Sequence, residues 1–333
     1  METDTTSNQR KAHQGLLREE LLLLRYTFGL NFGRSPEMYH QTCADVGGEN
    51  LPGSAIKDLL IVSVDSESPQ CQIGKAITHC RIGVSIFDTR HLHTRTTDTN
   101  DYSILETFNF CMGKPERHKK NIWRFCFGQS KFIDSIEEIR HEIQNLISGR
   151  DVVLVVHGGQ EDLAFLEGAQ IDLRPLYILD TQKAAQHPLD LDRRPNLGEL
   201  LTLLKCPFNP EMLHSAGNDA NFTLRALLLI AALDAKNHLE EEHECSSLLW
   251  TLEGVATEFI PLKEFQGRFE KEILAYVKRV NPKSHGRRAR RKIQAKAIRK
   301  KQAQLKALAI LNAPDPIEVA RACKKNWIKL LLS

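Results

Sequence analysis

Short apolar runs, separated by polar or glycine-rich stretches, recur through the first two thirds of the chain. Residues 58–65 form a nearly continuous apolar run of strand length, and residues 76–87 follow with alternating apolar and polar positions. Short apolar runs and alternation are both typical of β-strands, so these two segments predict a β-hairpin. The same patterns predict further strands at residues 121–128, 151–156 and 176–179.

Apolar positions spaced three and four residues apart predict the helices between and around these strands. The predicted helices cover residues 15–27, 135–148, 161–167 and 197–204, and a largely buried helix follows Asp219. Strands that begin as a hairpin and then alternate with helices favour an α/β fold with a mixed sheet.

Changes in composition along the chain predict five segments. They are an N-terminal helix and loop (1–54), the α/β domain (55–236), a helical extension (237–282), a basic segment (283–306) and a C-terminal helix (307–333). We expect the helices near both termini to be accessory to the domain and available to protein partners.

Positive charge is concentrated in the basic segment. The formal net charge of the chain is only +3 at pH 7, yet residues 283–306 contain eleven Lys and Arg and no Asp or Glu. Such a segment can neutralise several phosphates of a nucleic acid, and it can equally act as a nuclear-import signal. The candidate nucleic-acid ligands are Arg287, Arg288, Arg290, Arg291 and Lys292.

The eight cysteines show neither a C-x-x-C pair nor the spacing of a zinc site, so we expect buried, reduced thiols. This usage predicts an intracellular protein, in the nucleus, the cytoplasm or both. The first ten residues are polar, and no apolar run approaches the roughly 18 residues of a membrane span. Neither a signal peptide nor a membrane anchor is therefore expected.

Four carboxylates and one imidazole stand out because each lies where a predicted strand ends or a predicted helix begins. Asp65 and Glu67 end the first strand, Asp162 lies in a first helical turn, and His214 precedes Asp219 at the start of the buried helix. Catalytic groups of α/β proteins gather at the carboxyl edge of the sheet. Hard oxygen ligands at this density suit Mg²⁺ or Mn²⁺, and a neutral imidazole beside them suits a general base for water.

The strand geometry allows the first two carboxylates to act together. Residues i and i+2 of a strand project from one face, and burying Asp65 and Glu67 without cations would be costly. Each group also has an ordinary explanation. An exposed D-x-E is unremarkable, Glu161 and Asp162 could simply complement a helix dipole, and His157 could be a core histidine.

The third segment constrains the position of the histidine. Five residues of continuous helix would rotate His214 and Asp219 about 140° apart, so they can converge only if the histidine precedes the helix. Ser215, Gly217 and Asn218 are suited to a loop with a capping residue. This arrangement places Asp219 in the first helical turn, with His214 free to approach it.

The order of these motifs resembles that of a known family. Asp-x-Glu at a strand end, His-x4-Asp after a strand and His-x4-Asp at a helix start resemble the DEDDh exonucleases of the ribonuclease-H-like superfamily. The resemblance covers about residues 58–236 and implies a mixed five-stranded sheet flanked by helices. The long insert between residues 90 and 132 and the flanking helices resemble a poorly characterised group of fungal exonuclease-like proteins.

The resemblance implies a metal-dependent 3′–5′ exonuclease that acts on RNA or single-stranded DNA with two Mg²⁺ or Mn²⁺ ions. Asp65 would bridge the ions, Glu67 and Asp219 would complete the first site, and Asp162 would hold the second ion. His214 would take the proton from the attacking water.

The chain departs from the family pattern at two positions. Gly158 and Glu161 stand where many members have an Asn and an aromatic residue, which affects contacts with the substrate strand more than metal binding. A second hypothesis, from a different class, is a nucleic-acid-binding adaptor in RNA metabolism that has a nuclease fold and vestigial catalysis; the presence of all five key residues favours the exonuclease. A phosphatase or nucleotide-binding domain is disfavoured because the chain has no P-loop and no G-x-G-x-x-G.

Overall fold

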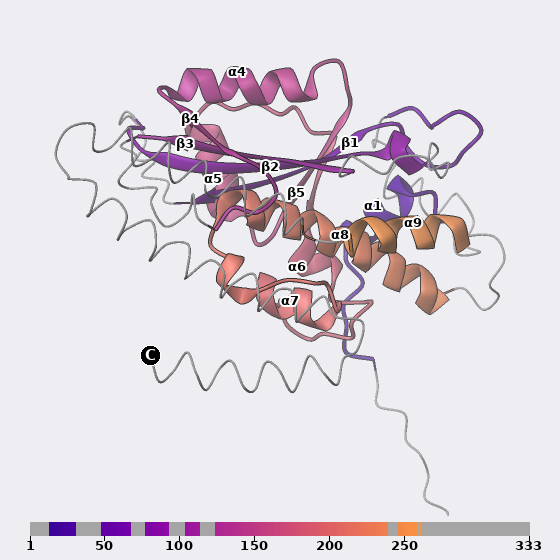
Figure 1. The fold of residues 1–333 in the computed structure, drawn as a ribbon. Coiled ribbons are helices and arrows are strands. Elements are labelled where there is room, and N and C mark those ends of the chain that lie inside the picture. Colours follow the sequence, from indigo (N-terminus) through magenta and orange to yellow (C-terminus); the bar gives the residue numbers. More distant parts are fainter. Residues whose placement is uncertain are drawn as a thin grey trace, which may run out of the picture.

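The protein is seen in a computed structural model, which describes one mixed α/β fold with helices on both faces of a sheet (Figure 1). The residues that the structure describes are 13–30, 48–67, 77–92, 104–113, 124–238, 246–258 and 260.

The sheet has six strands in the order β4-β3-β2-β1-β5-β6. β1, β2 and β3 are antiparallel neighbours, β4 runs parallel to β3, and β5 and β6 continue the sheet parallel to β1. Their bounds are Leu60–Glu67 (β1), Cys80–Asp88 (β2), Leu105–Met112 (β3), Ser130–Ile133 (β4), Val152–Val156 (β5) and Tyr177–Asp180 (β6). The predicted mixed sheet and its hairpin of β1 and β2 are confirmed, with six strands in place of five.

Seven α-helices are described, and they divide between the two faces of the sheet (Figure 1). α4 and α5 contribute to the hydrophobic core on one face, and the other five contribute to the core on the opposite face. Their bounds are Glu19–Thr27 (α1), Ile136–Ile147 (α4), Gln160–Gly168 (α5), Thr181–Ala184 (α6), Leu197–Leu203 (α7), Ala216–His238 (α8) and Ser246–Ala256 (α9). The predicted helices are confirmed with shifted ends, and α1 begins four residues later than expected.

The polar residues at the end of β1 lie on alternate faces of the sheet. Ile61 belongs to the core on the α8 side, whereas Val62 and Val64 belong to the core on the α4 side. Successive side chains of a strand alternate between faces, so Asp65 and Glu67 share the α8 face. Ser66 points to the face that α4 and α5 cover.

The strand predicted at residues 121–128 is wrong. Residues 124–128 form a turn and bends, while residues 121–123 lie outside the described residues. The Asn218 side chain accepts from the Cys126 N–H at 3.0 Å and donates to the Arg124 carbonyl at 2.7 Å. A helix side chain thus satisfies backbone groups that a neighbouring strand would otherwise bond. The third and fourth strands are β3 and β4, neither of which the sequence pattern predicted.

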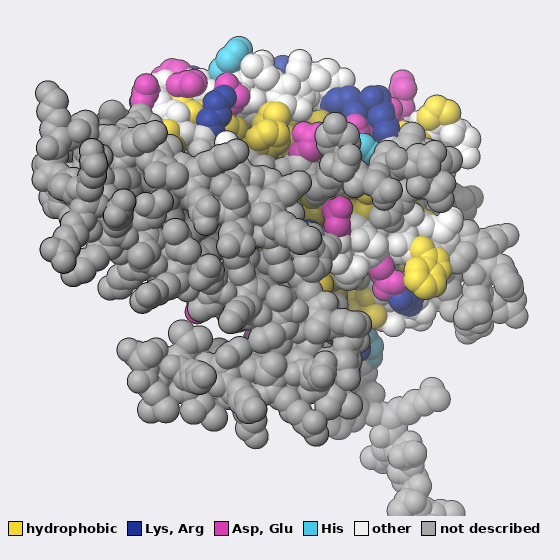
Figure 2. Space-filling model, viewed as in Figure 1, with side chains coloured by type: hydrophobic (Ala, Val, Ile, Leu, Met, Phe, Trp, Pro, Cys, Tyr) yellow, Lys and Arg dark blue, Asp and Glu magenta, His cyan; other side chains and the backbone are white. Residues whose placement is uncertain are grey.

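Several predictions lie wholly or mostly outside the described residues. The basic segment 283–306, with Arg287, Arg288, Arg290, Arg291 and Lys292, and the C-terminal helix 307–333 are not described. Within the described part of the face in Figure 2, acidic and basic side chains are interspersed. None of the helices in the described ranges is long and apolar enough to cross a membrane.

Candidate metal centre

Asp65 and Glu67 lie at the carboxyl end of β1, in the middle of the sheet. β2 flanks this strand on one side, and β5 flanks it on the other. From Leu60 to Val64 the strand is buried, and the burial decreases from Asp65 onward. The two carboxylates therefore stand where the hydrophobic interior opens to solvent.

Asp219 reaches the same place from α8. The helix begins at Ala216, and an oxygen of Asp219 in its first turn accepts a hydrogen bond from the Ser215 N–H at 3.1 Å. The other oxygen, Oδ1, is buried and has no hydrogen-bond partner among the described residues. An orphaned buried carboxylate oxygen is costly unless a cation or water meets it.

His214 precedes α8 in the left-handed backbone region, with φ of 62°. The prediction that it lies ahead of the helix is confirmed, but the loop is shorter than expected because Gly217 and Asn218 already belong to α8. One ligand atom each from Glu67, His214 and Asp219 lies within 4.8 Å of the others. Two carboxylates and an imidazole thus converge from β1 and from the start of α8.

A close backbone contact brings α8 to the sheet. Gly83 of β2 lies opposite Asp65 in the strand register. A Cβ added at Gly83 would lie 1.9 Å from the Ala216 carbonyl oxygen, so only glycine fits. The Gly217 N–H donates to the Asn109 side chain of β3 at 3.2 Å. The start of α8 therefore rests on the sheet backbone beside Asp65.

Asp162 arrives from the other face, in the first turn of α5. Its Oδ1 accepts hydrogen bonds from the Ser66 N–H at 2.7 Å and from the Ser66 hydroxyl at 2.6 Å. Asp162 is thereby tied to the residue between Asp65 and Glu67. It is not a member of the group formed by Glu67, His214 and Asp219.

Burial and mutual repulsion raise the pKa values of these carboxyls. Burial raises the pKa of Asp65 well above its usual range, and the charges of Asp219, Asp162 and Glu67 raise it further. Burial, followed by repulsion from Glu67, raises the pKa of Asp219 to about 8. Burial also raises the pKa of Asp162, against the two hydrogen bonds from Ser66. The cluster carries more negative charge than its surroundings balance.

Two arginines that the sequence analysis missed approach this cluster. Arg81 of β2 contacts Glu67, with Nη2 3.0 Å from Oε2. Arg124 donates to the Leu213 carbonyl at 3.2 Å, and its charge opposes the rise in the pKa of Asp219. The strand register would have indicated Arg81, whereas Arg124 lies in the segment that was wrongly predicted as a strand.

His157 has a structural environment. Its Nδ1 lies 2.8 Å from the Thr181 hydroxyl, and burial lowers the pKa of the ring to about 4. The neighbouring Gly158 has φ of 66°, and its N–H donates to the Asp180 side chain at 3.0 Å. These contacts favour a neutral core histidine that supports the turn between β5 and α5.

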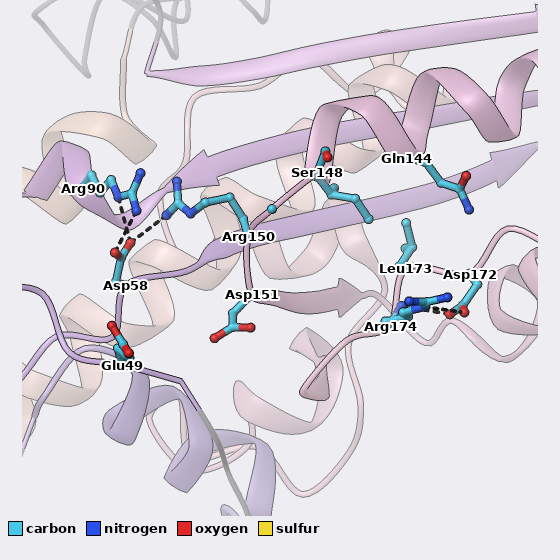
Figure 3. A pocket seen from close by; sticks show the side chains of 12 residues that line it. Glu49, Asp58, Arg90, Gln144, Ser148, Arg150, Asp151, Asp172, Leu173 and Arg174 are labelled. Atoms are coloured by element: carbon cyan, nitrogen blue, oxygen red, sulfur yellow. Dashed lines mark hydrogen bonds and ion pairs between the residues drawn. The ribbon is translucent and has the colours of Figure 1, made fainter.

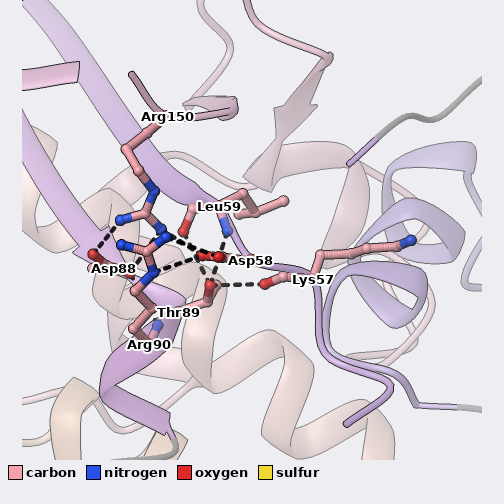
Figure 4. A network of polar contacts seen from close by, with 7 residues as sticks. All are labelled: Lys57, Asp58, Leu59, Asp88, Thr89, Arg90 and Arg150. Carbon is pink, nitrogen blue, oxygen red and sulfur yellow. Dashed lines mark hydrogen bonds and ion pairs between the residues drawn. The ribbon is translucent and has the colours of Figure 1, made fainter. Parts of the chain in front are cut away.

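A second group of charged residues lies at the opposite edge of the sheet, beside a pocket (Figure 3). Arg150 donates to Asp88 at 2.6 Å and to Asp58 at 2.8 Å, and Arg90 donates to both oxygens of Asp58 at 2.9 Å (Figure 4). The hydrogen bond from Arg90 lowers the pKa of Asp58. Burial raises the pKa of Asp88, but hydrogen bonds from Arg150 and Arg90 outweigh it. We call this group the paired edge, and the cluster around Asp65 the carboxylate edge.

The chemistry of the carboxylate edge suits divalent cations. Its donors are hard carboxylate oxygens, one of them buried without a described partner, and a histidine lies beside them. Asp65, Glu67 and Asp219 share one side, and Asp162 approaches from α5. The residues present therefore fit Mg²⁺ or Mn²⁺.

Comparison with known proteins gives one family match. The family model described as DNA polymerase III subunit epsilon-like, C-terminal domain, matches residues 60–230, which is more than half of the chain. The matched range runs from the start of β1 into α8 and contains all five candidate site residues. No curated protein matches the chain.

Proposed function

Because the chain belongs to the DEDDh exonuclease family, we propose that it is a metal-dependent 3′–5′ exonuclease acting on RNA or single-stranded DNA. Family membership by itself points to a nuclease hydrolase with a nucleic-acid substrate, and such nucleases typically use divalent metals. The observation that carries the proposal is the convergence of Glu67, His214 and Asp219 next to Asp65, in a cluster whose pKa values are raised.

Each residue has a role in this proposal. Asp65, Glu67 and Asp219 would hold one ion, and Asp162 with Asp65 would hold the other. When bound, the two cations supply Lewis-acid stabilisation of the negative charge that develops on the phosphate. A ring nitrogen of His214, which is exposed beside Asp219, would accept the proton of the attacking water.

Local structure supports the role of His214. The Ser215 N–H donates a hydrogen bond to the Asp219 carboxylate, so the backbone next to His214 is held beside the proposed metal ligands. The imidazole itself is exposed to solvent. This combination keeps the base close to the carboxylates and leaves it accessible to water.

Two positions bear on contacts with the substrate strand rather than on metal binding. Gly158 and Glu161 both lie exposed near the turn before Asp162, where many family members present an Asn and an aromatic residue. Without those side chains, a substrate strand would have fewer groups to stack on or to bond.

The test uses the full chain with end-labelled RNA and single-stranded DNA, in Mg²⁺, Mn²⁺ or EDTA. We expect 5′-labelled strands to shorten in a ladder, 3′-labelled strands to release a labelled mononucleotide at once, and EDTA to stop both. Asp219→Asn should remove the activity, whereas Asp172→Asn, an exposed carboxylate away from the centre, should keep it. Wild-type protein that binds either strand in Mn²⁺ and never shortens it would contradict the exonuclease and support the adaptor.

A further inference from the structure

Arg81 is a buried cation directly beside a proposed metal ligand. It lies opposite Glu67 in the register of β1 and β2, and its Nη2 is 3.0 Å from Glu67 Oε2. Only 8% of the Arg81 side chain is exposed, and 21% of the Glu67 side chain. By contrast, the pair of Arg174 and Asp172 is 89% and 62% exposed. Solvent screens such an exposed pair strongly, but screens the Arg81 pair much less.

Burial limits the conformations that this pair can adopt. A glutamate side chain has three rotatable bonds, and a free carboxylate would sample several orientations. Adjacent strands hold the two backbones at a fixed separation, and the guanidinium presents its donors in a rigid plane. The contact through Oε2 therefore restricts the direction of the Glu67 carboxylate.

We propose that Arg81 is a positioning residue for Glu67, which holds one carboxylate oxygen so that the other is presented to a divalent cation. The inference rests on the proposed function, because it assumes that Glu67 is a metal ligand. Carboxylates that bind metals are commonly oriented by hydrogen bonds from residues behind them, and loss of such a partner typically weakens metal binding about 10- to 100-fold.

A role in charge balance alone makes a different prediction. Arg81 also attracts Asp65 and opposes the rise of its pKa. If only this charge mattered, its removal would make the cluster more negative and would strengthen the binding of a cation. Removal of Arg81 should therefore weaken cation binding if Arg81 orients Glu67, and strengthen it if Arg81 only balances charge.

The experiment measures Mn²⁺ affinity of the full chain by isothermal titration calorimetry, without nucleic acid. We expect Arg81→Ala to bind Mn²⁺ about 10- to 100-fold more weakly than wild type. Arg81→Lys, which keeps the charge without the planar fork, should recover only part of the loss. Arg150→Ala, which removes an arginine of similar burial that pairs with carboxylates at the opposite edge, is the matched control and should bind as wild type.

A double-mutant cycle separates this role from general damage to the fold. If Arg81 acts through Glu67, Arg81→Ala should add nothing in a Glu67→Ala background. Arg81→Gln serves where Arg81→Ala does not fold, and circular dichroism checks each variant. Unchanged or tighter Mn²⁺ binding by the variants, or additive losses in the cycle, would overturn the role of Arg81 alone. Wild-type protein that binds no Mn²⁺ would overturn the proposed function as well.

Discussion

The paired edge and the carboxylate edge lie at opposite ends of β1 and β2 and contain the same residue types, but the pKa values of their carboxyls are shifted in opposite directions. At the paired edge, Asp58 precedes β1 and Asp88 ends β2, and arginine hydrogen bonds lower the pKa of both. At the carboxylate edge, burial and mutual repulsion raise the pKa values of Asp65 and Asp219. The difference separates an edge whose carboxylates are paired with arginines from an edge whose carboxylates are buried together and repel one another.

Besides burial, which is the largest cause of the raised pKa values, the two edges differ in the ratio of cations to carboxylates. At the paired edge, Arg90 and Arg150 each donate hydrogen bonds to Asp58, and Arg150 also donates to Asp88. At the carboxylate edge, Arg81 contacts one of the four carboxylates. Arg124 affects Asp219 only through its charge. Perturbed pKa values of this kind gather at functional sites.

The largest effect is expected from Asp65→Asn. The substitution should lower exonuclease activity by more than about 100-fold, because it removes the carboxylate that is proposed to hold both ions. In EDTA at pH 8 the same variant should melt several degrees higher than wild type, because it removes a charge that burial and its neighbours oppose. Nuclease assays and thermal melts measure the two changes.

Asp58→Asn is the matched control for that prediction. It replaces a carboxylate that two arginines stabilise, so it should lower the melting temperature and leave the activity of the folded protein intact. If Asp65→Asn and Asp58→Asn shift the melting temperature in the same direction, the contrast between the two edges is wrong.

The pH dependence of stability should also separate the edges. The folded pKa of Asp219, about 8, lies above the usual value of 3.8, so between these values the folded state binds more protons than the unfolded state. Stability in EDTA should therefore fall as pH rises from about 4 to about 8, by on the order of 10 °C in melting temperature. Thermal melts across this range measure the slope.

Two controls accompany the pH series. Saturating Mn²⁺ should flatten the slope, since a bound cation stabilises the charged carboxylates, and Asp219→Asn should reduce it in EDTA. The paired edge contributes the opposite sign, because its lowered pKa values give stability that is lost only as pH falls below about 4. A metal-free protein that gains stability up to pH 8 would contradict the raised pKa of Asp219.

The smallest effect is expected from Arg150→Ala at the paired edge. Asp88 would lose its hydrogen bonds from Arg150, and Asp58 would keep only those from Arg90. Removal of a half-buried partner should cost about 1–3 kcal/mol in the free energy of unfolding, measured by urea denaturation. Activity well below the melting temperature should stay at the wild-type level. A large loss of activity would instead connect this edge to catalysis.

Much of the fold follows from local patterns that the sequence displays. The apolar run of β1, the alternation of β2 and the helical spacing of α4 gave elements that the structure confirms. β3 was not predicted, because buried Asn109 interrupts its apolar positions and because the strand lies within the long insert. The Asn109 side-chain oxygen accepts from the Gly217 N–H, and its NH2 group donates to the Ser130 hydroxyl; these are tertiary contacts that no local pattern displays.

The candidate site was predictable in its residue types and less so in its geometry. The structure brings Glu67, His214 and Asp219 together, while their roles in metal binding and catalysis stay proposals. Asn218 was predicted as a loop or capping residue, but its side chain instead fixes the Arg124 segment. Contacts of this kind depend on how distant segments pack, so they could not be read from spacing.

The contact at Gly83 means that the separation between the site's two halves is set by the absence of a single carbon atom. In Gly83→Ala a methyl group would act as a wedge against the Ala216 carbonyl, 1.9 Å away, and would push the start of α8 from β2. All four acids and the histidine would remain, and the net charge would not change. Gly83→Ala is therefore expected to abolish the proposed activity by moving α8 away from the sheet, while every proposed metal ligand and the proposed base are still present.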